Sequence, residues 1–162
     1  MTLDWKTLLD SKGPFVSFTS SEESALDDFV NSAPEFTPAV IRIVRGKRCA
    51  TRDRLFQEWA AALQFPSYFA ENWDAFEECL SDLEWLPAGG LVVFITRADC
   101  LLDLAPEDDL DMLADILTTV AKEWRSSHPI APFHLVFHAQ PEDEAKARQR
   151  LAVAGFISES RG

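Results

Sequence analysis

An unbroken apolar run, Leu91-Val92-Val93-Phe94-Ile95, places the strongest limit on what this chain can fold into. A strand that is apolar on both faces must be covered on both, which is typical of a parallel sheet between helices. Two further runs, Ala39 to Val44 and Phe133 to Phe137, are mostly apolar and rich in strand-forming residues. Helical patterns separate the three runs. Strands alternating with helices predict an α/β fold around a small parallel sheet.

Helix ends can be predicted from capping residues. Thr51 is a good N-cap for a helix with a regularly spaced apolar face. A long helix is expected from about Pro106 to Trp124, and a last helix from Asp143 to Ala154 with Gly155 as its C-cap. With 162 residues and 47% hydrophobic content, the chain is long enough for one domain with a proper core.

Residues 1–36 form an extension that we expect to pack on an open face of the core, while residues 37–162 form the main domain. Phe15 to Phe18 alternate in polarity and predict an edge strand. Ser20 or Ser21 can cap a helix over Glu22 to Val30.

The stretch from Phe65 to Trp85 contains the clearest helix signals. Pro66 ends the preceding helical pattern, and Asn72 is a good N-cap for the next helix. Apolar residues then recur at spacings of three and four, which marks one buried helix face: Trp73, Phe76, Leu80 and Leu83. Phe76 and Cys79 are expected in the core. For Trp73, and for Tyr68 ahead of the helix, a core role and a contact role both stay open.

Carboxylates occupy a different side of the same helix. Asp74, Glu78 and Asp82 are four residues apart, with Glu77 beside them, so they form a ridge with about 6 Å between successive members along the axis. An acid in the first helical turn can be explained by the helix dipole alone. Glu78 and Asp82 lie beyond that turn, so the ridge is a candidate binding surface.

The sequence Y-F-A-E-N-W-D-A-F-E-E-C-L resembles the signature of the barstar family of intracellular ribonuclease inhibitors, roughly Y-Y/F-G-x-N-x-D-A-L-W-D-C-L. Six positions match outright: Tyr68, Asn72, Asp74, Ala75, Cys79 and Leu80. The departures include Ala70 for glycine, Glu77 for tryptophan and Glu78 for aspartate. The resemblance covers roughly residues 38–138 and implies a barstar-like fold, a three-stranded parallel sheet packed by helices.

The resemblance also implies a function, in which a helix and its preceding loop block the active site of a basic ribonuclease. The residues expected to contact the partner are Tyr68, Asn72, Trp73, Asp74, Glu77, Glu78 and Asp82. The alternative is an immunity or adaptor protein on the same scaffold with ribonuclease recognition lost, which the missing tryptophan favours because aromatic anchors contribute much interface energy. A third possibility is a carboxylate-dependent hydrolase, but no nucleophile or oxyanion donor accompanies the acids, so we expect no enzyme.

Charge supports a basic protein as partner. The formal net charge is −12, with 27 acidic and 15 basic residues, although acidity also serves solubility. Such a chain repels nucleic acid, whose binding depends on cations at phosphates, and attracts a basic protein. We expect no cofactor, since no nucleotide-binding glycine motif occurs, and no metal, although His134 and His138 would share a strand face.

The sequence gives no sign of a membrane or a secreted location. No apolar run approaches 18 residues, and the first residues lack the features of a signal peptide. The chain has three cysteines, Cys49, Cys79 and Cys100, and none of them is part of a C-x-x-C pattern. We therefore expect reduced thiols in a cytoplasmic protein.

Overall fold

Four parallel strands form one sheet in the computed structural model, which describes residues 3–83, 85–86 and 89–158. The strand order is β1-β4-β3-β2, and the strands are β1 (Val16–Ser20), β2 (Val40–Arg45), β3 (Leu91–Thr96) and β4 (Phe133–Ala139). The α/β fold class with a parallel sheet is confirmed, and the sheet has one strand more than the three expected. The added strand is the predicted edge strand of the N-terminal extension, with Val16 opposite Leu135.

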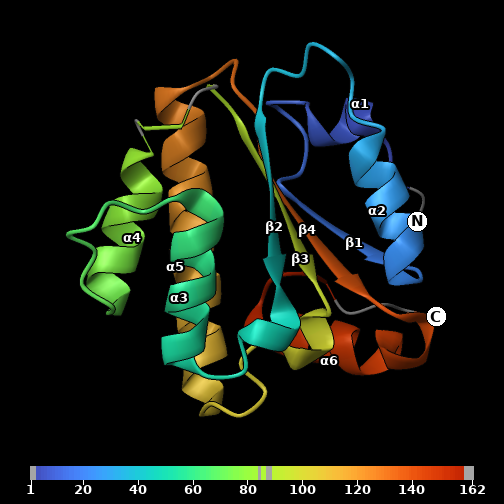
Figure 1. Ribbon diagram of the computed structural model, residues 1–162, viewed down its shortest axis with the longest axis vertical. Helices are drawn as coiled ribbons and strands as arrows, with labels where there is room; N and C mark the ends of the chain where they lie inside the picture. Colours follow the sequence, from blue (N-terminus) through green and yellow to red (C-terminus); the bar gives the residue numbers. More distant parts are fainter. Residues whose placement is uncertain (1–2, 84, 87–88, 159–162) are drawn as a thin grey trace.

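Helices cover both faces of the sheet and give three layers (Figure 1). One face is covered by α3 (Arg52–Leu63), α4 (Trp73–Asp82) and α5 (Glu107–Ser127), and the other by α1 (Trp5–Leu8) and α2 (Glu23–Asn31). Strands β2, β3 and β4 follow one another across the sheet, whereas the chain from β1 to β2 returns in the opposite direction. Right-handed crossovers therefore place α2 on the face opposite to α3, α4 and α5.

The carboxyl ends of the strands meet short turns and the last helix. These elements are η1 (Gly46–Arg48), η2 (Ala98–Cys100), η3 (Pro141–Asp143) and α6 (Glu144–Ala154), all in the lower part of Figure 1. Helix α6 ends at Gly155, whose φ of 95° lies in the left-handed region, as its predicted C-cap role requires. The long helix α5 begins after Pro106, as expected, and extends to Ser127.

The core has two parts because strand side chains alternate between the faces of the sheet. Val93 and Ile95 of β3 face the layer of α3, α4 and α5, whereas Val92 and Phe94 face α1 and α2. On the second face Trp5 stacks on Phe29 at 4.8 Å between ring centroids, and both rings meet Phe94 edge-on. Coverage on both sides explains why the β3 run is apolar without interruption.

The predicted serine cap of α2 is wrong. The N-cap residue is Glu22, and its side chain makes no capping hydrogen bond. Ser20 is the last residue of β1, and the backbone N–H of Ser21 donates to Ala139 O of the neighbouring chain segment at 3.1 Å. Both serines therefore continue the strand pairing with β4, which keeps them out of the capping position.

Candidate functional site

Helix α4 has the orientation that its apolar spacing predicts. Phe76 and Leu80 are fully buried, and the Phe76 ring lies 5.7 Å from Phe56 and 5.5 Å from Trp59 of α3. The Asn72 side-chain oxygen accepts the N–H of Ala75 at 2.8 Å, as expected of an N-cap. The helix is thus fixed on the core by its apolar side, and its acidic side faces outward.

The acidic face of α4, which we define as Asp74, Glu77, Glu78 and Asp82, is paired with no cation of the described residues. Asp74, Glu78 and Asp82 are exposed, whereas Glu77 is half-buried. In residues 3–83, 85–86 and 89–158, none of these carboxylates accepts a hydrogen bond or forms an ion pair. Their field reaches the buried Cys79 thiol: burial raises its pKa, and the charges of Glu78 and Asp82 raise it further. The acidic face is therefore an uncompensated negative surface.

The loop before α4 is anchored by two phenylalanines. Phe65 and Phe69 meet at 5.1 Å between ring centroids, and Phe69 also meets Phe56 edge-on at 6.0 Å. The N–H of Phe69 donates to Pro66 O at 3.0 Å and closes a turn. Between these anchors Tyr68 is 73% exposed. The loop thus holds a large aromatic side chain at the surface beside the start of α4.

The seven sequence-predicted partner-binding residues all lie on α4 or on the loop that leads into it. Trp73, whose role the sequence leaves open, is half-buried and packs edge-on against Phe56 at 5.0 Å and Phe76 at 5.8 Å. Most of its ring therefore belongs to the core. Asn72 uses its side-chain oxygen for the cap, and its side-chain amide N–H groups can donate to a partner.

Helix α5 adds a carboxylate that the sequence did not indicate. Ser81 Oγ of α4 donates to Glu123 Oε2 of α5 at 3.4 Å, so Glu123 lies beside the last turn of the acidic helix. The apolar pattern of α5 predicts that Glu123 is exposed, but only the packing of α5 against α4 shows that it extends the acidic surface.

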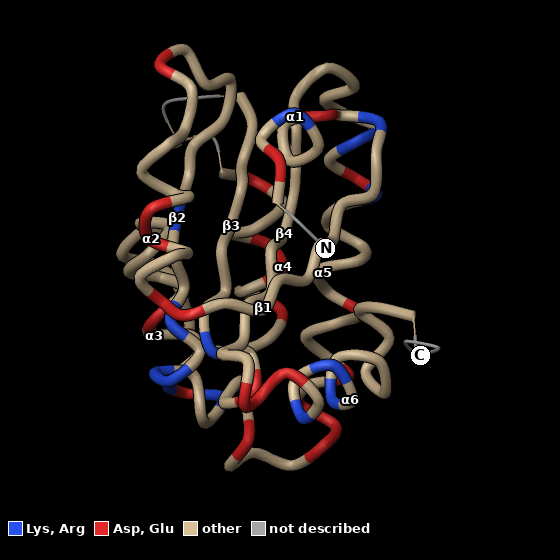
Figure 2. The backbone as a smooth tube through the Cα atoms, turned by 90° about the vertical axis from the view of Figure 1, so that its right-hand side faces the viewer, with Lys and Arg blue, Asp and Glu red and all other residues tan. Residues whose placement is uncertain are grey.

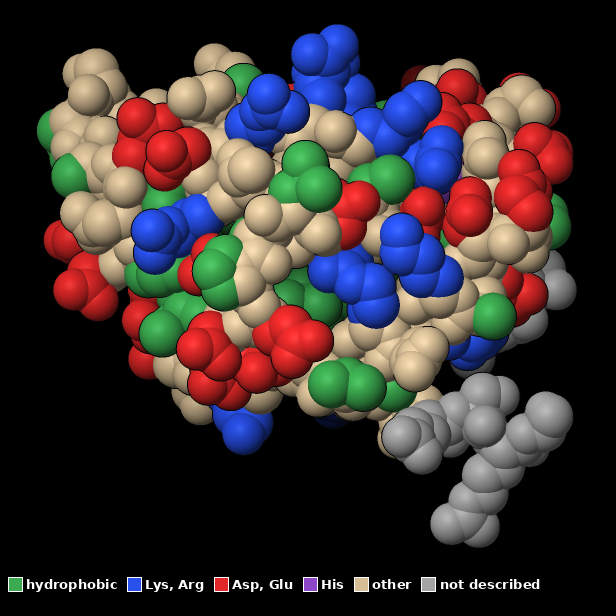
Figure 3. All heavy atoms as spheres, turned by 90° about the horizontal axis from the view of Figure 1, so that it is seen from below, with side chains coloured by type: hydrophobic (Ala, Val, Ile, Leu, Met, Phe, Trp, Pro, Cys, Tyr) green, Lys and Arg blue, Asp and Glu red, His purple; other side chains and the backbone are tan. Residues whose placement is uncertain are grey.

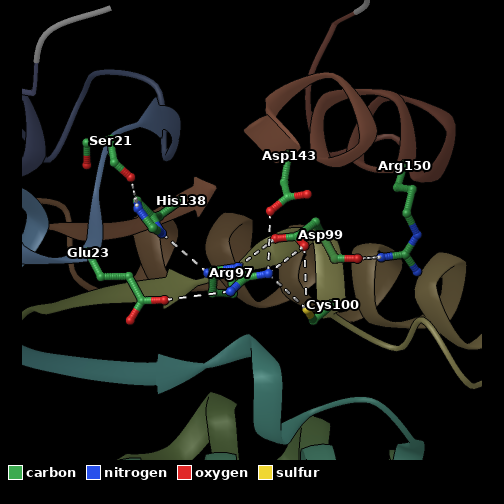
Figure 4. A network of polar contacts seen from close by, with 8 residues as sticks. All are labelled: Ser21, Glu23, Arg97, Asp99, Cys100, His138, Asp143 and Arg150. Carbon is green, nitrogen blue, oxygen red and sulfur yellow. Dashed lines mark hydrogen bonds and ion pairs between the residues drawn. The ribbon is translucent and has the colours of Figure 1, made fainter. Parts of the chain in front are cut away.

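A second polar cluster lies at the carboxyl ends of β3 and β4, centred on Arg97 (Figure 4). The Arg97 guanidinium pairs with the buried Asp99 at 3.2 Å, Asp143 at 3.4 Å and Glu23 at 3.9 Å. Burial raises the pKa of the Asp99 carboxyl, but the hydrogen bond and charge of Arg97 outweigh it and hold that pKa below its ordinary value. These pairs connect α2 and η3 to the strand ends, so the cluster joins the N-terminal extension to the core.

The side chains around Arg97 do not assemble a nucleophile. Burial raises the pKa of the Cys100 thiol, and the neighbouring Asp99 raises it further, which keeps the sulfur protonated. His138 is fully buried, with Nε2 2.8 Å from Ser21 O and Nδ1 accepting the N–H of Arg97 at 3.3 Å. Both ring nitrogens are therefore engaged in holding the chain together.

The two strand histidines share a sheet face, as predicted, but each has its own protein partner. His134 Nε2 lies 2.7 Å from Ser17 Oγ of β1. Within the described ranges no group of three or more His, Cys, Asp or Glu side chains could hold a metal ion. Over the same residues, no helix combines the length and the apolar character needed to cross a bilayer.

The fold defines the structural class of the protein, and a sequence comparison defines its family. A parallel sheet between two helical layers defines an α/β protein of the three-layer type. The chain belongs to the barstar family, since the family model described as barstar (barnase inhibitor) matches residues 39–138. No curated protein matches the sequence.

A solved structure supports the fold alone. A chain in the structure of Drosophila ORC bound to AT-rich DNA and Cdc6 is similar with a TM-score of 0.52 and 16% sequence identity. The match covers 95% of the present chain and 50% of that chain, so the protein spans half of its length.

Proposed function

We propose that this protein is a cytoplasmic inhibitor of a basic ribonuclease, which it blocks with the acidic face of α4 and the loop before it. One observation supports the proposal above all. A chain of the family described as barnase inhibitor exposes a row of carboxylates that is paired with no cation among the described residues. The surface acts by binding, and the proposal assigns it no catalytic step.

The spacing of the acids suits a site that binds a nucleic-acid backbone. Asp74, Glu78 and Asp82 succeed one another about 6 Å apart along the helix axis, since each step is four residues. Each carboxylate can accept paired hydrogen bonds from an arginine, as a phosphate group does. The ridge would therefore replace substrate phosphates in the active site of the ribonuclease, with Tyr68 packing at its edge.

A single charge removal tests this mode of binding. Glu78→Ala should weaken binding to a barnase-type ribonuclease by about 2–5 kcal/mol, mostly through faster dissociation, because cations of the partner would stay buried without a counter-charge. The range comes from protein interfaces in general, the barnase–barstar complex among them. Calorimetry and stopped-flow dissociation measure the loss.

Asp27→Ala provides the matched control. Asp27 is an exposed carboxylate on α2, which covers the opposite face of the sheet, so the substitution changes the net charge equally without touching the acidic face. It should leave affinity nearly unchanged. Equal binding by wild type and Glu78→Ala would locate the interface elsewhere. A wild type that binds no such ribonuclease would favour the immunity or adaptor alternative, for which Glu77 in place of the family tryptophan is the motivating observation.

Ionic strength provides a second test of the same surface. The rate of association with the ribonuclease should fall steeply between low and high salt, because screening shortens the reach of the attraction between the acidic protein and its basic partner. Stopped-flow measurements at constant pH give this dependence. An association rate that is indifferent to salt would contradict electrostatic steering.

A further inference from the structure

Basic residues gather at one corner of this acidic protein. The segment Arg45-Gly46-Lys47-Arg48-Cys49-Ala50-Thr51-Arg52-Asp53-Arg54 holds five of the 15 lysines and arginines of the chain and one acid. It forms the end of β2, the turn η1 and the start of α3, at the carboxyl edge of the sheet. Lysine and arginine positions concentrate near this end of the molecule along the backbone (Figure 2), and their side chains are prominent on the face seen from below (Figure 3).

Three arginines of this corner line one pocket. Arg45, Arg48 and Arg54, together with Gln57 and Glu58, line a shallow, open pocket of about 460 Å³. Glu58, which is 8% exposed, accepts hydrogen bonds from the backbone N–H, Nε and Nη2 of Arg45 at 2.9, 2.9 and 3.0 Å. Burial raises the pKa of the Glu58 carboxyl, but its bonds to Arg45 and the charges of Arg45 and Arg48 bring it below the ordinary value. Glu58 is thus ionised and neutralises Arg45.

The other two arginines are bonded to no carboxylate of the described residues, and Arg48 acts on Glu58 through its charge alone. Arg48 and Arg54 are exposed, and their side chains form no ion pair or hydrogen bond with any residue in the described part of the chain. The nearby Arg52, by contrast, pairs with Asp109 at 3.9 Å and does not line this pocket. Two guanidinium charges are therefore left over in the pocket, with the Gln57 side-chain amide as a further hydrogen-bond donor.

The backbone that holds the arginines is fixed from several sides. Gly46 packs so closely on the chain after β3 that a Cβ atom would lie 2.3 Å from the carbonyl oxygens of Thr96 and Arg97. The carbonyl of Cys49 accepts the N–H of Leu102 at 2.7 Å. The backbone of this turn is therefore already ordered, and binding has to order only the side chains of Arg48 and Arg54.

The geometry points to a binding site for a phosphate monoester in this pocket, separate from the acidic face and independent of the ribonuclease proposal. A phosphate monoester carries nearly two negative charges at neutral pH, which matches the two unpaired guanidinium groups, and arginine binds phosphate oxygens in pairs. The pocket lining has no aromatic or aliphatic side chain on which a base could stack. A long nucleic acid would also meet the net charge of −12 elsewhere on the surface. We therefore expect the phosphate group to be the part that is recognised, whether inorganic or carried by a nucleotide.

Titration of the full chain with inorganic phosphate tests the site, with chloride used to hold ionic strength constant. Amide NMR shifts on addition of phosphate should concentrate in residues 45–58. The four nucleoside monophosphates should bind as phosphate does, and the nucleosides should not bind. Arg48→Gln or Arg54→Gln should each weaken binding about 10-fold, because each removes one charge-assisted contact.

Lys47→Gln is the matched control, since Lys47 lies on the same turn, is exposed and does not line the pocket. Its affinity for phosphate should stay within about 2-fold of wild type, as expected for a rim charge outside the direct contacts. The proposal is overturned by an absence of shifts in residues 45–58 at millimolar phosphate. It is also overturned by an equal loss in Lys47→Gln, which would indicate general charge attraction, or by binding of long RNA without binding of phosphate.

Discussion

Acid should destabilise this protein through His134, a buried side chain with one unsatisfied ring nitrogen. His134 is 1% exposed, its Nε2 lies 2.7 Å from Ser17 Oγ, and its Nδ1 has no hydrogen-bond partner in the described part of the chain. Burial, followed by the positive charge of Arg125, lowers the pKa of His134 to about 4. Protonation would give the ring two N–H groups, of which the one on Nδ1 would have no acceptor. It would also add a positive charge near Arg125, so the folded chain keeps the ring neutral.

The sign and size of the effect follow from the difference between the folded and unfolded pKa. In the unfolded chain a histidine has a pKa of about 6.5. Above this pH both states are neutral, and the stability does not depend on the residue's titration. Below it the unfolded chain takes up a proton that the folded chain does not, so stability falls until about pH 4 is reached. At about 1.4 kcal/mol for each pKa unit, the loss over this window approaches about 3 kcal/mol.

Urea unfolding of wild type and His134→Gln between pH 7.5 and 4.5, followed by tryptophan fluorescence, isolates this contribution. Carboxylates titrate in both proteins and cancel in the difference of their unfolding free energies. That difference should shift by about 2–3 kcal/mol in favour of the variant as the pH falls. Parallel pH profiles for wild type and His134→Gln would refute the buried neutral state of His134.

Three substitutions test the packing of α4 and the Arg97 cluster by denaturant melts at neutral pH. Leu80→Ala should cost about 2–5 kcal/mol of stability because it leaves a cavity in the core, whereas Asp82→Ala on the exposed side should change stability by no more than about 0.5 kcal/mol. Equal losses would contradict the orientation of α4. Arg97→Met should cost about 3–5 kcal/mol, since it leaves the buried Asp99 carboxylate without its cation, and a negligible loss would show that the pair is dispensable.

Helix ends were predictable where one side chain makes the cap. Thr51 Oγ accepts the N–H of Arg54 at 3.3 Å and Asn72 caps α4 in the same way, both within four residues of chain. The start of α2 was not predictable by this rule, because the serines that could cap it are used in pairing with β4. The capping preference of a serine is overridden where a strand that is distant in sequence pairs with the same residues.

The three core strands could be located from their apolar runs, but the width of the sheet could not. Strand β1 adds to β4, whose sequence lies more than a hundred residues further along, through a parallel register that no local pattern specifies. The apolar character of Val136 and Phe94 on the second face did indicate that something must cover it. Which segment covers it was decided by tertiary packing of α1 and α2.

The acidic face was predictable in outline because helical periodicity alone separates the carboxylates from Phe76 and Leu80. Its surroundings were not. Glu123 comes from another helix, and the Arg97 cluster joins residues from α2, η2 and η3. The pocket of Arg48 and Arg54 was predictable from the sequence only in part. Its basic run is visible in the chain, but the neutralisation of Arg45 by Glu58, which leaves the other two unpaired, appears only in three dimensions.

Glu77 gives the acidic face a character that differs from the family signature. A tryptophan at this position would offer an apolar anchor, whereas the half-buried Glu77 offers another carboxylate beside Glu78. An interface built on such a row derives less from apolar burial and more from charge, and like charges on one helix stay close only at a cost in free energy. A partner that repays this cost must bring several cations to α4 at once. If α4 is the contact surface, as the inhibitor proposal holds, this requirement predicts a partner with a densely basic cleft, and a partner without such a cleft would favour the immunity or adaptor alternative.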